Sequence, residues 1–178
     1  MNPKRGSKTQ DIALSGLLFA LAMALSFVEG TLVITGLMPG MKLGLANIVV
    51  MYALFLMGGK QALVLDLLKA LFVFLVSGWT AGFLSLCGGL FSLLVMWVLY
   101  YHFPVQPTWF ILSVCGALAH NVGQLLGASV ILSSAMSLYY APVMLVFGLI
   151  MGSLTSITLR ALLPALGRLG SNTREKRR

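Results

Sequence analysis

Six long segments with almost no charge dominate the chain. They cover approximately residues 12–28, 43–57, 61–77, 83–100, 109–133 and 138–159. A helix that crosses a bilayer needs roughly 20 apolar residues, so six spans use up most of a chain of 178 residues. Only 9% of the residues are charged, whereas a water-soluble domain carries about 25%. The sequence therefore predicts one all-α membrane domain, residues 1–178, built as a bundle of six transmembrane helices.

The basic residues indicate how this bundle is oriented. With the N-terminus inside, all but Lys42 and Lys69 of the 12 Lys and Arg residues fall on the inner side. Basic residues beside membrane helices mark the cytosolic face. We therefore expect a multi-pass protein of the cytoplasmic cell membrane, with a basic cytoplasmic N-terminus (1–11), a bundle (12–159) and a basic cytoplasmic tail (160–178). The net charge of +8 then reflects contact with lipid headgroups and needs no nucleic-acid partner.

The outer connection 29–42 is apolar but too short to cross a bilayer, and its Gly and Pro residues supply bends. It is either a lid over an outward-facing pocket or a simple interfacial turn. Lys42, the one cation expected outside, contacts an anionic ligand or anchors to headgroups. Trp79, in a predicted outer loop 78–82, anchors to the interface or stacks on a ligand.

Two segments carry stripes of small residues at helical spacing, which let another helix approach closely. Each stripe either packs inside the bundle or docks a partner subunit. The stripe of the first segment consists of Ala13, Gly16, Ala20 and Ala24, and that of the sixth consists of Gly148, Gly152 and Ser156.

Polar side chains gather in the fifth segment. Ser113, His120 and Gln124 share one face of a helix, and Asn121 lies further round. Polar groups at membrane depth are costly, so they face partners or a water-filled cavity. They form a ligand site or bond neighbouring helices. In the third segment, Asp66 and Lys69 are three residues apart and can form an ion pair.

Catalytic chemistry is poorly supported by the sequence. The chain has four acidic residues and no aspartate-rich motif to hold the magnesium that prenyl-diphosphate chemistry requires. It contains no phosphate-binding GxxxxGK[ST] loop, so ATP hydrolysis would need a separate subunit. Cys87 and Cys115 have no metal-site spacing. We expect no catalytic residue, no metal and no cofactor, and hence not an enzyme.

Three motifs together resemble a known family. They are PGMKLGLANI at 39–48, SLCGG at 85–89 followed by Ser92 and Met96, and GALAHNVGQL at 116–125. The chain resembles the Gx transporters, also called heptaprenyl diphosphate synthase component I. That family is similar to the substrate-binding (S) components of energy-coupling factor vitamin transporters, which are six-helix bundles.

The resemblance implies a role for several regions. Ala20 and Ala24 match the docking motif of S components for their transmembrane coupling subunit, and 29–42 matches their gating loop. The fourth to sixth helices would wall the pocket. An arginine is expected in the third helix, where this chain has Lys69, which puts the ligand geometry in doubt. The predicted substrate-binding residues are Lys42, Asn47, Trp79, Ser85, His120, Asn121 and Gln124.

The predicted function is therefore that of an S component. It would capture a small vitamin-, flavin- or isoprenoid- or quinone-like molecule from outside and work with a coupling subunit and ATPase subunits. One alternative is a non-catalytic membrane component of a heptaprenyl diphosphate synthase. Another is a channel or a structural bundle without a ligand. The sequence leaves the substrate, the oligomeric state and the role of Asp66 and Lys69 open.

Overall fold

The computed structural model describes residues 8–31, 44–102, 107–132 and 139–170, which form six α-helices and no strand. This confirms the all-α prediction. The helices are α1 (Lys8–Thr31), α2 (Asn47–Leu56), α3 (Gly59–Ser77), α4 (Trp79–Tyr101), α5 (Trp109–Leu132) and α6 (Ala141–Gly170).

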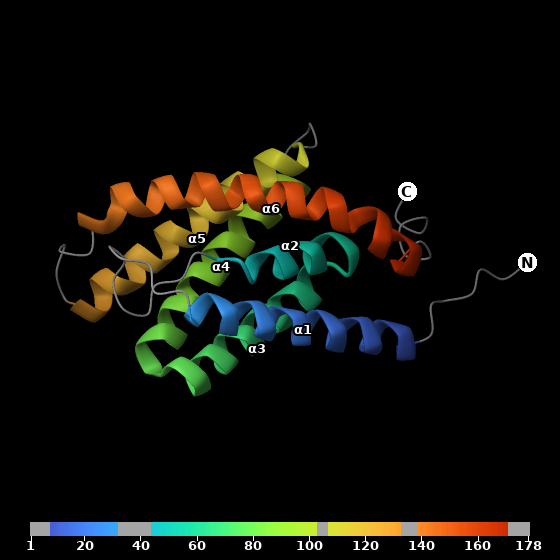
Figure 1. Ribbon diagram of the computed structural model, residues 1–178, viewed down its shortest axis with the longest axis horizontal. Helices are drawn as coiled ribbons and strands as arrows, with labels where there is room; N and C mark the ends of the chain where they lie inside the picture. The colour runs from blue at the N-terminus through green and yellow to red at the C-terminus, as the bar shows by residue number, and fades with distance from the viewer. Residues whose placement is uncertain (1–7, 32–43, 103–106, 133–138, 171–178) are drawn as a thin grey trace, which may run out of the picture.

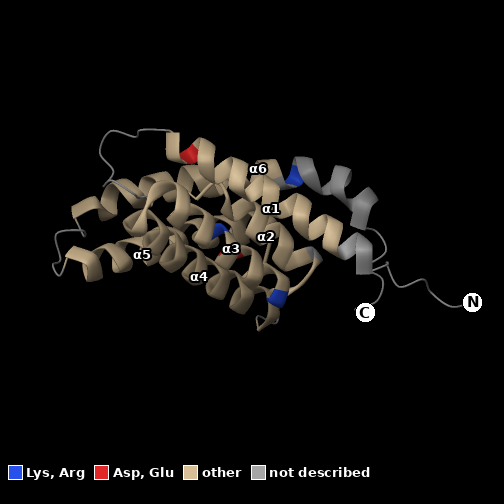
Figure 2. Ribbon diagram, turned by 90° about the horizontal axis from the view of Figure 1, so that it is seen from below, with Lys and Arg blue, Asp and Glu red and all other residues tan. Residues whose placement is uncertain are grey.

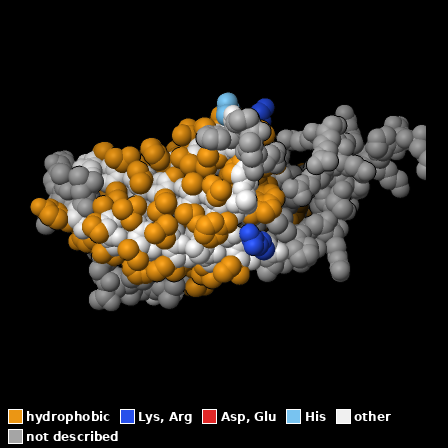
Figure 3. Space-filling model, turned by 90° about the horizontal axis from the view of Figure 1, so that it is seen from above, with side chains coloured by type: hydrophobic (Ala, Val, Ile, Leu, Met, Phe, Trp, Pro, Cys, Tyr) orange, Lys and Arg blue, Asp and Glu red, His pale blue; other side chains and the backbone are white. Residues whose placement is uncertain are grey.

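Four helices are long and apolar enough to cross a membrane. They contain the stretches Ile12–Thr31, Trp79–Tyr101, Trp109–Leu132 and Ala141–Thr158. Hydrophobic side chains are spread over the described part of the face in Figure 3, as expected of a surface in contact with lipid. The 10 residues of α2 extend only about 15 Å, half the hydrocarbon thickness. The structure thus describes a multi-pass membrane protein and supports four of the six expected spans.

The short helix α2 forms the centre of the bundle (Figure 1). Its residues from Ile48 to Leu54 are all buried, and α2 contacts each of the other five helices. Leu18 and Ala22 of α1 and Leu65 of α3 join it in the main hydrophobic core. The helices α3, α4, α5 and α6 pack in succession. α1 begins and α6 ends at the same end of the bundle.

Helices α4 and α6 extend beyond the predicted segments. The predicted outer loop 78–82 was wrong, since the chain is helical again from Trp79. Gly78 is the only residue between α3 and α4. Gly78 makes this break with φ +86°, a left-handed conformation that favours glycine. α6 continues to Gly170, so the first part of the predicted tail 160–178 is helix.

The small-residue stripe of α6 lies inside the bundle. Gly148, Gly152 and Ser156 are buried, and a Cβ added at Gly152 would lie 2.7 Å from the Cα of Val114 on α5. The glycines of α5 likewise bring α4 close, because a Cβ at Gly123 would lie 2.6 Å from the carbonyl oxygen of Cys87. These stripes serve packing within the chain.

The small-residue stripe of α1 faces out of the bundle. Ala13, Gly16, Ala20 and Ala24 are all exposed, whereas the opposite face of the helix, with Leu18 and Ala22, is buried in the core. A Cβ added at Gly16 would meet no atom within 4 Å. The alternative that this stripe packs within the bundle is therefore wrong.

Candidate ligand-binding site

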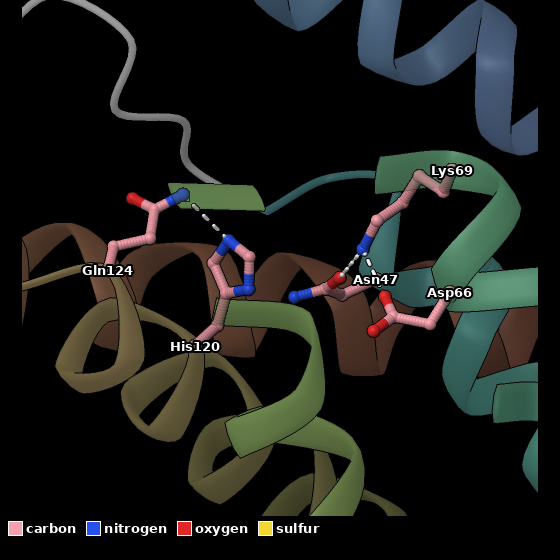
Figure 4. A network of polar contacts seen from close by, with 5 residues as sticks. All are labelled: Asn47, Asp66, Lys69, His120 and Gln124. Atoms are coloured by element: carbon pink, nitrogen blue, oxygen red, sulfur yellow. Dashed lines mark hydrogen bonds and ion pairs between the residues drawn. The ribbon is translucent and has the colours of Figure 1, made fainter. Parts of the chain in front are cut away.

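A buried polar network joins three helices at the centre of the bundle (Figure 4). On α3, the Lys69 ammonium lies 2.6 Å from Oδ1 of Asp66, which confirms the predicted pair. Lys69 also donates a hydrogen bond of 2.7 Å to Oδ1 of Asn47, the first residue of α2. Asp66 is 0% exposed and Lys69 is 2% exposed. Charges so deeply buried persist only when they are paired and hydrogen-bonded. Elsewhere, charged residues are sparse on the described helices (Figure 2).

On α5, His120 and Gln124 form the other half of the network. Their Nε2 atoms lie 3.0 Å apart, one helical turn from each other, and both side chains are buried. This confirms that they share a face. In Figure 4 the other ring nitrogen of His120 points toward the amide nitrogen of Asn47. Neither Nδ1 of His120 nor Nδ2 of Asn47 has a hydrogen-bond partner among the described residues.

Two glycines of α4 make room for the network. A Cβ at Gly89 would overlap the Asp66 carboxylate, and a Cβ at Gly88 would lie 2.6 Å from Cε1 of His120. Since any larger residue would push these side chains away, the glycines position the network. Sequence reasoning did not assign them this role, although both belong to the quoted 85–89 motif.

Glu29, near the end of α1, holds the backbone at Gly44 and Leu45 next to the network. Its buried carboxylate accepts hydrogen bonds from the backbone N–H groups of Gly44 and Leu45. Gly44 has φ +90°, and a Cβ there would lie 3.0 Å from the His120 ring. Sequence reasoning missed Glu29 as a site residue. A single acid at the end of an apolar helix was the available signal.

We expect Glu29→Ala to loosen this attachment, because it leaves two backbone donors without their acceptor. Such a loss costs about 1–3 kcal/mol, so amide hydrogen exchange at Gly44 and Leu45 should accelerate about 5- to 150-fold. Glu29→Gln keeps an acceptor oxygen and should show a much smaller increase. Equal exchange rates in both variants and the unchanged protein would contradict this role of Glu29.

A small cavity lies beside the network. Its volume is about 10 Å³, which is room for about one water molecule. A larger guest enters only if the surrounding helices move apart. Two larger hollows are lined by other residues: one of about 280 Å³ lies between α1, α2 and α3, and one of about 190 Å³ lies between α1 and α3. The small cavity is lined by Gly44, Asn47, Met51, Ser92, Met96, Ser113, Gly116, Ala117, Met151 and Thr155.

The structure brings Asn47, His120 and Gln124 together but not every predicted site residue. Asn121 turns toward α6 and donates a 2.6 Å hydrogen bond to the carbonyl oxygen of Met144. Ser85 is buried in α4. Trp79 is 64% exposed and stacks on Phe83 with ring centroids 5.6 Å apart. Lys42 and most of the predicted lid 29–42 lie outside the described residues.

The fold and the network define a class of protein: a multi-pass helical membrane protein with a paired polar core. Within residues 8–31, 44–102, 107–132 and 139–170, no group of three His, Cys, Asp or Glu residues could hold a metal ion.

Residues 18–162 match the sequence model of the family described as heptaprenyl diphosphate synthase component I. The match covers most of the chain, so the protein belongs to this family, as the motifs indicated. No curated protein and no solved structure shows significant similarity to the chain.

Proposed function

We propose that this protein is the substrate-binding membrane subunit of an importer of the energy-coupling-factor type. The observation that carries the proposal is the buried network of Asp66, Lys69, Asn47, His120 and Gln124. Helix packing alone gives no reason to bury polar atoms without partners, such as Nδ2 of Asn47 and Oγ of the neighbouring Ser92. A substrate that binds at this point would provide the missing partners. The cargo would be a small vitamin-, flavin- or isoprenoid- or quinone-like molecule.

The exposed small-residue stripe of α1 is evidence for binding of a partner subunit. Ala13, Gly16, Ala20 and Ala24 form a narrow exposed face on which another membrane helix can pack closely. In this proposal the partner is the transmembrane coupling subunit, and separate ATPase subunits supply the energy. The chain crosses the cytoplasmic membrane with both ends in the cytosol, and α2 and α3 lie within the membrane.

The family description favours one second candidate, a non-catalytic membrane component of a heptaprenyl diphosphate synthase. The acids with described side chains support no catalytic part in that reaction. Of the two acidic residues with described side chains, Asp66 is paired with Lys69, while Glu29 bonds the backbone of Gly44 and Leu45. The two candidates differ in what they require, since only the importer needs a coupling subunit for uptake.

The proposal is tested by ligand capture and uptake. Native mass spectrometry of the purified protein should show one co-purified small molecule, and its uptake by cells should require the coupling subunit. We expect His120→Gln to weaken binding at least tenfold, because the partners of Nδ1 and Nε2 change together. Ser129→Ala removes a hydroxyl that bonds the Leu125 carbonyl within α5 and serves as the control. If it weakens binding as much, the network is not the site, and uptake without the coupling subunit would refute the importer.

A further inference from the structure

The small cavity of the bundle is bordered by hydrogen-bond donors that have no acceptor. Asn47 and Ser92 line it, and both side chains are at least nine-tenths buried. Nδ2 of Asn47 and Oγ of Ser92 have no hydrogen-bond partner among the described residues. Buried polar atoms are normally satisfied, so a cavity with two such atoms points to an occupant.

The contacts of Asn47 settle which end of its amide faces His120. The Lys69 ammonium can only donate, so the Asn47 atom 2.7 Å from it must be the carbonyl oxygen. The amide NH₂ group is therefore directed away from Lys69. Figure 4 shows it pointing toward the imidazole ring of His120.

His120 does not line the cavity, and its ring contacts Gln124 instead. The Gln124 amide nitrogen, 3.0 Å from Nε2 of His120, can only donate. Nε2 is then the acceptor, and in the neutral ring the proton lies on Nδ1. The donors that border the cavity without a partner among the described residues are therefore the NH₂ of Asn47 and the hydroxyl of Ser92.

We infer that these donors bind one hydrogen-bond-accepting oxygen. This inference rests on the proposed function. In the empty protein the oxygen belongs to a water molecule, for which a volume of about 10 Å³ suffices. In the loaded protein it belongs to a carbonyl or carboxylate group of the substrate, which displaces the water and reproduces its hydrogen bonds.

The rest of the surroundings narrows the substrate class further. Lys69 is neutralised by Asp66, so the selection comes from the donors: an ammonium group has no acceptor and cannot pair with the NH₂ of Asn47. Met51, Met96 and Met151 line the same cavity. Flexible thioether side chains adapt to apolar bodies of varied shape. The substrate is therefore an apolar molecule that carries a carbonyl or carboxylate group and no ammonium group at the bound end.

Three probes with the same ring system test this specificity: 2-naphthoate, 2-acetylnaphthalene and 2-naphthylmethylamine. Binding is measured by calorimetry on the full chain in lipid nanodiscs. We expect both acceptor probes to bind at least tenfold more tightly than the amine. Ser92→Ala, and Asn47→Asp, which keeps an acceptor for Lys69 but removes the NH₂ group, should each weaken 2-acetylnaphthalene at least tenfold. Ser153→Ala is the control, because that hydroxyl bonds the Leu149 carbonyl on an exposed face.

The amide of Asn47 provides a readout that needs no substrate. In ¹⁵N-asparagine-labelled protein, its NH₂ signal should show a cross-relaxation peak with water that disappears when 2-acetylnaphthalene binds. The inference is overturned if the Asn47 NH₂ shows no cross-relaxation peak with water, or if the acceptor probes bind no more tightly than the amine. If the preference holds while uptake proceeds without a coupling subunit, the acceptor site stands and the importer fails. If uptake requires the coupling subunit but Ser92→Ala and Asn47→Asp leave the binding of 2-acetylnaphthalene unchanged, the importer stands and the acceptor site fails.

Discussion

Replacing Ala20 and Ala24 together with leucine should abolish assembly with the coupling subunit while leaving the folded chain intact. Both residues are exposed, so the added leucine side chains are not forced into the buried core. We expect the free energy of unfolding to change by less than about 0.5 kcal/mol. A close helix–helix contact, however, depends on small residues, and two leucines would hold the partner helix away. Co-purification of the complex should fall at least tenfold.

Ala22→Leu is the matched control, because it makes the same chemical change two residues away on the opposite face. Ala22 is 0% exposed and belongs to the main core. Overfilling a packed core costs about 1–3 kcal/mol, so this variant should lose stability in denaturation experiments in detergent. A double variant that still assembles normally would show that the stripe faces lipid only. A double variant that unfolds readily would contradict the described position of α1.

Lys69→Met should destabilise the protein more than any other single change considered. It removes the only described cation beside the Asp66 carboxylate, which is fully buried. Leaving one charge of a buried pair without its partner costs about 3–5 kcal/mol. The variant should unfold at a much lower denaturant concentration and lose ligand binding, because Asn47 also loses its contact with Lys69.

Two further variants show whether the unpaired charge is the cause. Lys60→Met makes the same replacement at an exposed position of the same helix, and it should change stability by less than about 0.5 kcal/mol. Asp66→Asn combined with Lys69→Met removes both charges and should recover at least about 2 kcal/mol of the loss. If the double variant is no more stable than Lys69→Met alone, the cost comes from lost packing and not from the buried carboxylate.

Much of the candidate site could be predicted from residue spacing within one helix. Asp66 and Lys69, and likewise His120 and Gln124, are close because helical geometry places residues three or four apart on one face. Contacts between helices could not be predicted in this way. The approach of Asn47 to Lys69 and to His120 depends on how α2, α3 and α5 are arranged, as does the attachment of Glu29 to Gly44.

The sequence by itself determined that this chain is an apolar helical bundle with a polar fifth helix, since composition and helical period report on local structure. Only the tertiary structure decided that the stripe of α6 is buried and that of α1 is exposed. The reason is physical: lipid and protein interior are similarly apolar, so hydrophobicity cannot tell which face of a membrane helix meets a neighbour. The same holds for α2, whose sequence reads as a membrane span although the helix is a short, buried centre of the bundle.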